Sequence, residues 1–236
     1  MEAGFTVFYI SAEENTLNKR NYQKELDKII DRLEQEKRVP TLFLHSCCAP
    51  CSSYVLEYLS RYFAITVFYY NPNISPASEY EARVREQERL IKEMNEEFRG
   101  DGKRHEIHFL KGEYHPEVFY EAMKGLEQEP EGGKRCTECF RLRLYEAARL
   151  AKEGGYDFFT TTLTISPLKD ADRLNAIGEA AAEAYGVSWL NSDFKKRNGY
   201  KRSTELSGEH KLYRQNYCGC VFSRQNSCLD IDGNLL

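Results

Sequence analysis

The strongest constraint on the fold of this chain is a regular alternation of short apolar segments with longer amphipathic ones. The apolar segments are bounded by chain breakers, as where residues 64–70 stop before Asn71-Pro72. Strands are predicted at residues 41–45, 64–70, 105–110, 157–162 and 187–190, and helices at 19–36, 76–98, 115–127, 137–153 and 170–185, with another beginning near Pro50. Helices of this length between strands indicate parallel crossovers. The pattern therefore predicts an α/β fold, a doubly wound, mostly parallel sheet flanked by helices.

The domain organisation follows from the same pattern. The 236 residues contain no internal repeat or flexible linker, so a single α/β domain over residues 1–236 is expected. Helical periodicity fades after Asn191, which predicts an irregular C-terminal extension at 193–236 that wraps over the active-site rim. The N-terminal segment lacks a basic start and is a poor secretory signal, and no apolar run approaches the roughly 18 residues of a spanning helix. A cytoplasmic protein with no membrane partner is expected.

Chemically informative loops follow several of the predicted strands. Cys47–Cys51 follows the first strand, residues 71–74 the second, residues 161–169 the fourth and Asp193 the fifth. Because ligands of open parallel sheets bind beyond the carboxyl ends of the strands, these loops are expected to converge on one rim.

Eight cysteines are the main compositional signal. A chain of this length in a reducing compartment has no need of a disulfide framework, so clustered cysteines indicate metal ligands or redox groups. Seven of them fall into three groups, which are Cys47, Cys48 and Cys51; Cys136 and Cys139; and Cys218 and Cys220. Cys228 stands alone and is interpreted as an incidental thiol.

The first two groups have the character of metal ligands. Cys47, Cys48 and Cys51 lie at a strand-to-helix turn, where a helix N-terminus stabilises thiolates. Cys136 and Cys139 form a Cys-x-x-Cys pair that opens the next helix. Together the two groups can supply four thiolates, the number that a [4Fe–4S] cluster takes, with one cysteine to spare. Structural zinc is the competing metal.

Cys218 and Cys220 flank a single glycine. Such a pair can close a small strained disulfide, and strained disulfides tend to be labile and catalytic. Additional metal ligation by these thiols stays open as an alternative.

The net charge of −4 excludes a globally basic nucleic-acid binder, but residues 195–214 are locally basic. Lys195, Lys196, Arg202 and Arg214 can meet phosphates, and Tyr200 can stack on a base. The alternative is a solvated loop.

The motifs taken together resemble the QueH-type epoxyqueuosine reductases. The resemblance spans roughly residues 40–225 and is carried by HSCCAPCS (45–52), NPNI (71–74) with Glu79-Tyr80, GKRCTECFRLR (133–143), TTTLTISPLK (160–169), DFKK (193–196) and LYRQNYCGCVFS (212–223).

This resemblance implies reduction of the epoxide of epoxyqueuosine, at the wobble position of tRNA, to give queuosine. It also implies an iron–sulfur cluster and a HUP/Rossmann-like fold. By motif, Cys47, Cys48, Cys136 and Cys139 would be the cluster ligands, and Cys218–Cys220 a redox-active disulfide. The electron donor is not identified.

Other assignments are hypotheses built on that resemblance. Cys51 is left over beside the cluster; it is a candidate ligand of an additional iron, with Asp193, or a residue that faces the substrate. The proton source is open among Asp193, Asp170, Lys195 and His45. Related ATP-using enzymes carry Ser-Gly-Gly after the first strand where this chain has Ser46-Cys-Cys, so ATP cleavage is not expected. Two other functions remain, a cluster-dependent tRNA sulfur transferase and a non-catalytic, zinc-stabilised RNA-binding module.

Overall fold

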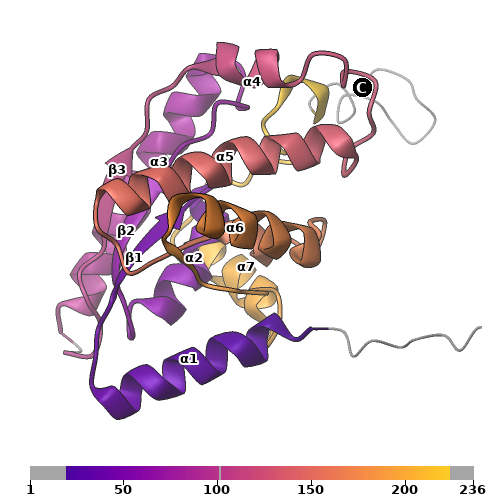
Figure 1. The fold of residues 1–236 in the computed structure, drawn as a ribbon. Helices are drawn as coiled ribbons and strands as arrows, with labels where there is room; N and C mark the ends of the chain where they lie inside the picture. The colour runs from indigo at the N-terminus through magenta and orange to yellow at the C-terminus, as the bar shows by residue number, and fades with distance from the viewer. Residues whose placement is uncertain (1–19, 101, 224–236) are drawn as a thin grey trace, which may run out of the picture.

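A single sheet of five parallel strands forms the centre of the molecule. The computed structural model describes residues 20–100 and 102–223 (Figure 1). The N-terminal segment assessed above as a secretory signal, Cys228 and the last part of the predicted extension lie outside these residues. The strands are β1 (Thr41–His45), β2 (Ala64–Tyr69), β3 (His108–Lys111), β4 (Phe158–Thr161) and β5 (Ser188–Trp189), in the order β3-β2-β1-β4-β5. All neighbouring strands pair in parallel, which confirms the predicted doubly wound α/β class.

Helices connect the strands at nearly the predicted positions. They are α1 (Tyr22–Glu36), α2 (Ala49–Leu59), α3 (Ala77–Phe98), α4 (Pro116–Ala122), α5 (Lys134–Glu153), the short 3₁₀ helix η1 (Thr162–Ile165), α6 (Ala171–Tyr185) and α7 (Gly199–Glu209). The end of α6 is set by Gly186, which takes the left-handed conformation that glycine favours at a helix C-terminus. The helix predicted at 115–127 is shorter than expected, because α4 ends at Ala122.

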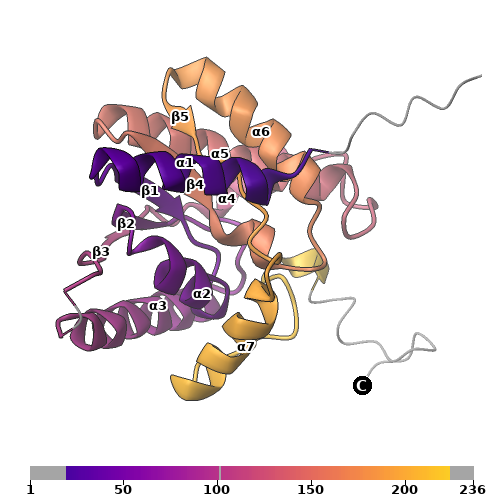
Figure 2. The same cartoon turned by 90° about the horizontal axis from the view of Figure 1, so that it is seen from below.

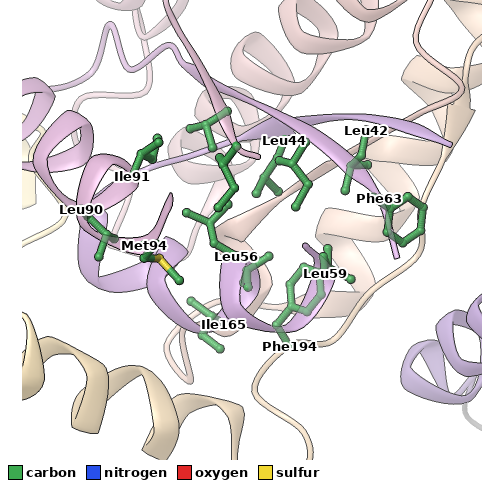
Figure 3. Packing of buried hydrophobic residues seen from close by; sticks show 14 of the residues in the cluster. Leu42, Leu44, Leu56, Leu59, Phe63, Leu90, Ile91, Met94, Ile165 and Phe194 are labelled. Atoms are coloured by element: carbon green, nitrogen blue, oxygen red, sulfur yellow. The ribbon is translucent and has the colours of Figure 1, made fainter. Parts of the chain in front are cut away.

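The sheet is buried on both faces. Alternation along β1 points Leu42 and Leu44 to one face and Phe43 to the other. Helices α1, α2 and α3 cover the first face, and α5 and α6 cover the second, as Figure 2 shows for α2 and α3 against α5 and α6. Figure 3 shows the first core, in which Leu56 and Leu59 of α2 pack beneath the β1 leucines. The two cores hold the carboxyl ends of the strands, and thus the loops after them, in fixed positions.

The extension after residue 193 is not irregular throughout, which corrects part of the sequence-based expectation. Residues 199–209 form α7, which packs against α2. The approach is close, since a Cβ at Gly199 would lie 2.5 Å from the ring of Tyr54 on α2. Periodicity did not reveal this helix because its buried face is made mainly of small residues, with Ser203 and Ser207 beside the single Leu206.

No helix among the described residues is both long enough and apolar enough to cross a membrane.

Candidate metal and redox site

Three cysteines gather where β1 gives way to α2. The sulfur atoms of Cys47, Cys48 and Cys51 all lie within 4.8 Å of one another, and those of Cys47 and Cys48 are 3.9 Å apart. Cys48 is the N-cap residue of α2, and Pro50 lies in its first turn. The first group therefore brings three thiols close enough to serve together as ligands of a metal centre.

Buried hydrogen bonds fix the backbone of this loop. The hydroxyls of Ser46 and Ser52 both donate to Oε1 of Gln87 on α3, at 2.7 and 3.0 Å. The Nδ2 of Asn71 donates to the carbonyl of Ser46 at 2.8 Å. Elements on both sides of the loop thus hold the three thiols in place before any metal binds.

The remaining two cysteine groups meet each other. Cys136, Cys139, Cys218 and Cys220 line one small cavity of about 30 Å³. Backbone amides donate to two of these sulfurs, from Gly132 to Cys136 at 3.2 Å and from Ser223 to Cys220 at 3.4 Å. Burial nevertheless raises the pKa of Cys220, and the amide of Ser223 opposes that rise.

The cavity lined by the first cysteine group adjoins the cavity lined by the other two groups. A cavity of about 550 Å³ is lined by Cys47, Cys48 and Cys51, and it shares Cys218, Arg143 and Lys169 with the smaller cavity. This space opens between the ends of β1 and β4, where the strand order reverses, the usual ligand position in such sheets. The predicted convergence is thus confirmed for the loops after β1, β2 and β4, since Asn71 and Leu163 also line the large cavity. All seven described cysteines are free thiols.

A buried cation lines both cysteine cavities. Arg143 on α5 is 1% exposed, and its Nη1 donates to Oδ1 of Asn71 at 3.3 Å. Its Nη2 is buried without a hydrogen-bond partner, and it forms no ion pair with a carboxylate in residues 20–100 and 102–223. A buried charge is costly unless it is compensated, so this guanidinium suits an anionic neighbour.

Lys169 supplies a second positive charge. Its Nζ lies 3.8 Å from the sulfur of Cys218, and the negative charge that this sulfur can carry raises the pKa of Lys169. Lys169 therefore stays protonated while it lines both cysteine cavities.

The thiols differ in acidity. Hydrogen bonds with Cys47 and Cys51 lower the pKa of Cys48 well below its usual value. Hydrogen bonds with Cys47 and Cys48 raise the pKa of Cys51. Burial raises the pKa of Cys139 to about 12. Cys48 is therefore the most acidic thiol of the first group, and metal binding would release the protons that these thiols still carry.

The Cys218–Gly219–Cys220 segment is anchored to the opposite side of the site. Gly219 has φ of +109°, and its carbonyl accepts a hydrogen bond from the amide of Ser75 at 2.9 Å. The buried Arg83 of α3 donates to the carbonyl of Cys218 at 3.4 Å. A Cβ at position 219 would lie 2.9 Å from Nη1 of Arg83, so both backbone conformation and space favour glycine.

Asp193 does not belong to the group of three cysteines. Its carboxylate pairs with Nζ of Lys195 at 2.7 Å, and both line a neighbouring cavity with Lys196 and Lys169. Its role as a ligand beside Cys51 stays a prediction.

The other predicted substrate-binding residues separate into two sets. Tyr200 and Arg214 line a third cavity, of about 280 Å³, together with Cys48 and Cys51. Arg202 instead pairs with Glu57 and Glu209, each at 2.7 Å. Its charge is therefore already neutralised by carboxylates.

Two of the candidate proton sources have structural roles. His45 is fully buried; its Nε2–H donates to the carbonyl of Tyr70, so Nδ1 accepts from the hydroxyl of Thr161. Burial lowers the pKa of His45 to about 3, so the ring is neutral. Asp170 caps α6 by accepting from the amide of Arg173 at 3.1 Å.

Sequence reasoning gave no role to Arg143, Lys169 or Gln87. A signal for Arg143 existed, because it follows Phe140 and precedes Ala147 on the apolar face of α5. A lone arginine on such a face indicates a buried charge with a partner.

The fold and site define a doubly wound α/β protein whose site is lined by thiols and two cations. The site lies at the switch point of the sheet, between β1 and β4, where the strand order reverses. The profile of the family described as "Epoxyqueuosine reductase QueH" matches residues 42–226. Curated relatives carry the same description. The protein from Staphylococcus epidermidis is 44% identical over 90% of this chain and 88% of its own length. That from Streptococcus pyogenes is 40% identical over 94% and 85%, and that from Thermotoga maritima 36% identical over 78% and 90%. The chain belongs to the epoxyqueuosine reductase QueH family.

Proposed function

We propose that this chain reduces the epoxide of epoxyqueuosine, at the wobble position of the tRNA anticodon, to give queuosine. The observation that carries the proposal is the meeting of seven thiols, from three distant segments, around adjoining cavities at the switch point of the sheet. The curated relatives are described as epoxyqueuosine reductases, which supports the proposal. A tRNA substrate implies action in the cytoplasm.

The reaction requires electrons, protons and the removal of the epoxide oxygen. Each turnover takes up two electrons and two protons, releases the epoxide oxygen as water, and leaves a carbon–carbon double bond. Oxidation of the Cys218 and Cys220 thiols to a disulfide would supply two electrons and two protons. An external reductant must then restore the dithiol.

We assign Cys47, Cys48, Cys136 and Cys139 to a [4Fe–4S] cluster and Cys51 to an additional iron; Asp193 would have to leave its ion pair with Lys195 to join Cys51 as a ligand. The fit rests on the chemistry of the donors, with thiols in two adjoining groups and the buried, uncompensated Arg143 beside them. Sulfur ligands and a nearby cation suit an anionic iron–sulfur centre. When bound, these groups would transfer single electrons and offer a Lewis-acidic position to the epoxide oxygen.

The protein's own residues supply charge and position. Lys169 is protonated and lines the large cavity, so its Nζ is placed to stabilise negative charge on the leaving oxygen. Asn71, whose amide bridges Ser46 and Arg143, holds the cysteine loop and the buried cation in register.

Nucleoside analysis tests the proposal. Reduced, anaerobically reconstituted protein should convert epoxyqueuosine to queuosine in tRNA, as detected by mass spectrometry of the digested nucleosides. Transfer of labelled sulfur into tRNA would instead identify a sulfur transferase. Zinc as the only bound metal, with unchanged epoxyqueuosine, would overturn the proposal in favour of a zinc-stabilised RNA-binding module.

A further inference from the structure

Leu168 is an apolar side chain in an unusual position. It lies in the loop between η1 and α6 and is 88% exposed. It nevertheless lines all three cavities described above, the two with cysteine thiols and the third beside α7. Its side chain is therefore available for contact with a ligand bound in any of the three cavities.

The third cavity has the properties of a base-binding pocket. Its volume of about 280 Å³ is bounded by apolar side chains of Pro50, Ile165 and Pro167 and by the ring of Tyr200, which is 42% exposed. Flat apolar walls with an exposed aromatic ring are suited to stacking a nucleobase.

The same cavity is also lined by a cationic side chain, that of Arg214. Nη1 of Arg214 donates to the hydroxyl of Ser207 at 3.0 Å, which holds the guanidinium in place. A fixed guanidinium next to a base pocket can contact the phosphate that joins two nucleotides.

The third cavity directly adjoins the large cysteine cavity. Both are lined by Cys48, Cys51, Gln215 and Leu168. Successive bases of a single strand stack on one another, and chemistry on one base requires that it leave the stack. Two adjoining cavities with an apolar side chain between them can receive two successive bases separately.

We propose that Leu168 is a wedge that separates the modified wobble base, in the large cavity, from the neighbouring base of the anticodon loop, which stacks on Tyr200 in the third cavity. Arg214 contacts the phosphate between them. This inference rests on the proposed function, because it takes the wobble nucleoside as the occupant of the large cavity.

Fluorescence of an anticodon stem-loop RNA tests the wedge. The RNA carries aminopurine next to the wobble position, where unstacking raises its emission. Binding to the wild-type protein should raise the emission, and Leu168→Ala should abolish most of that rise. Leu110→Ala is the matched control, since Leu110 is 43% exposed on β3 and lines none of these cavities.

Affinity for the same RNA tests the stacking platform. Tyr200→Ala should weaken binding about 5- to 150-fold, the range for loss of one base–aromatic stack, and Tyr200→Phe should restore it. Tyr120→Ala, at 44% exposure on α4, should bind as the wild type does.

The outcomes separate this inference from the reductase proposal. If the wild-type protein reduces epoxyqueuosine in tRNA but Leu168→Ala and Tyr200→Ala leave emission and affinity unchanged, the wedge is wrong and the reductase stands. If the wild type shows the expected emission and variant effects without reducing epoxyqueuosine, the pocket stands and the reductase is wrong. If a protein electron donor occupies the third cavity and competes with the RNA for binding there, the wedge is also wrong.

Discussion

The Nε of Arg143 donates at 3.0 Å to the carbonyl of Cys139, one helical turn earlier, and so holds a buried cation beside a buried thiol. A cation in this position raises the reduction potential of a nearby anionic centre and favours its retention. Arg143→Met should therefore lower both the iron content after reconstitution and the midpoint potential, whereas Arg143→Lys should retain part of each.

Thermal unfolding of the metal-free Arg143→Met protein supplies the complementary measurement. Replacing an unpaired buried charge by an apolar side chain of similar size is often neutral or stabilising, so the metal-free variant should unfold at the same or a higher temperature. Normal iron content and an unchanged potential in this variant would contradict the role assigned to Arg143.

The thiol pair is expected to act in turnover rather than in holding iron. Cys218→Ser and Cys220→Ser should each keep the iron content of the wild type and lose multiple turnover, because neither can close the disulfide. Iron analysis and tRNA turnover test this together, with Cys228→Ser as the control outside the three groups. Loss of iron in both serine variants would assign these thiols to the metal instead.

Gly219→Ala should disturb the position of the pair without removing a thiol. The added methyl group meets Arg83 at 2.9 Å, and φ of +109° strains any L side chain. We expect a destabilisation of about 1–3 kcal/mol and slower disulfide formation, measured by urea unfolding and by alkylation of free thiols. Gly208→Ala, which meets nothing within 4 Å on α7, should be neutral or gain up to about 1 kcal/mol.

Asp157 should make the free energy of unfolding depend on pH in the acid range. Its carboxylate accepts from the amide and hydroxyl of Thr41 at 2.8 and 2.9 Å and pairs with Arg38, joining the starts of β1 and β4. These contacts, led by the Thr41 amide, lower the pKa of Asp157. Its contribution is therefore complete above the unfolded pKa of about 3.9 and is lost as the pH falls through the lower folded value.

Urea unfolding at two pH values measures this contribution. Asp157→Asn should cost about 1–2 kcal/mol at pH 7 and less as the pH falls through the folded pKa of Asp157, where the wild type also loses the charge. Asp31→Asn, on the exposed side of α1, is the control. An equal cost at both pH values would show that charge is not involved.

The sequence was sufficient for the fold where apolar periodicity was strong. β1, β2, α3 and α6 lie where breakers and periodicity predicted them, because their buried faces are apolar. α7 was missed because it buries Ser203 and Ser207, which carry no such signal. The fifth strand was predicted at residues 187–190, but only Ser188 and Trp189 pair with β4, and the apolar pattern could not show where that pairing begins and ends.

The site was predictable in its residue types but not in its distances. Cysteine spacing indicated three groups, and strand order explains why they meet. It could not show that Cys51 joins Cys47 and Cys48 within 4.8 Å, that Asp193 pairs with Lys195, or that Arg202 is neutralised by carboxylates. These outcomes depend on side-chain packing between segments far apart in the chain.

Anomalous diffraction at the iron edge, from crystals grown without oxygen, tests the central claim most directly. The account predicts iron in contact with the sulfurs of Cys47 and Cys48 and with those of Cys136 and Cys139. Iron absent from these thiols, or zinc alone in its place, would contradict it.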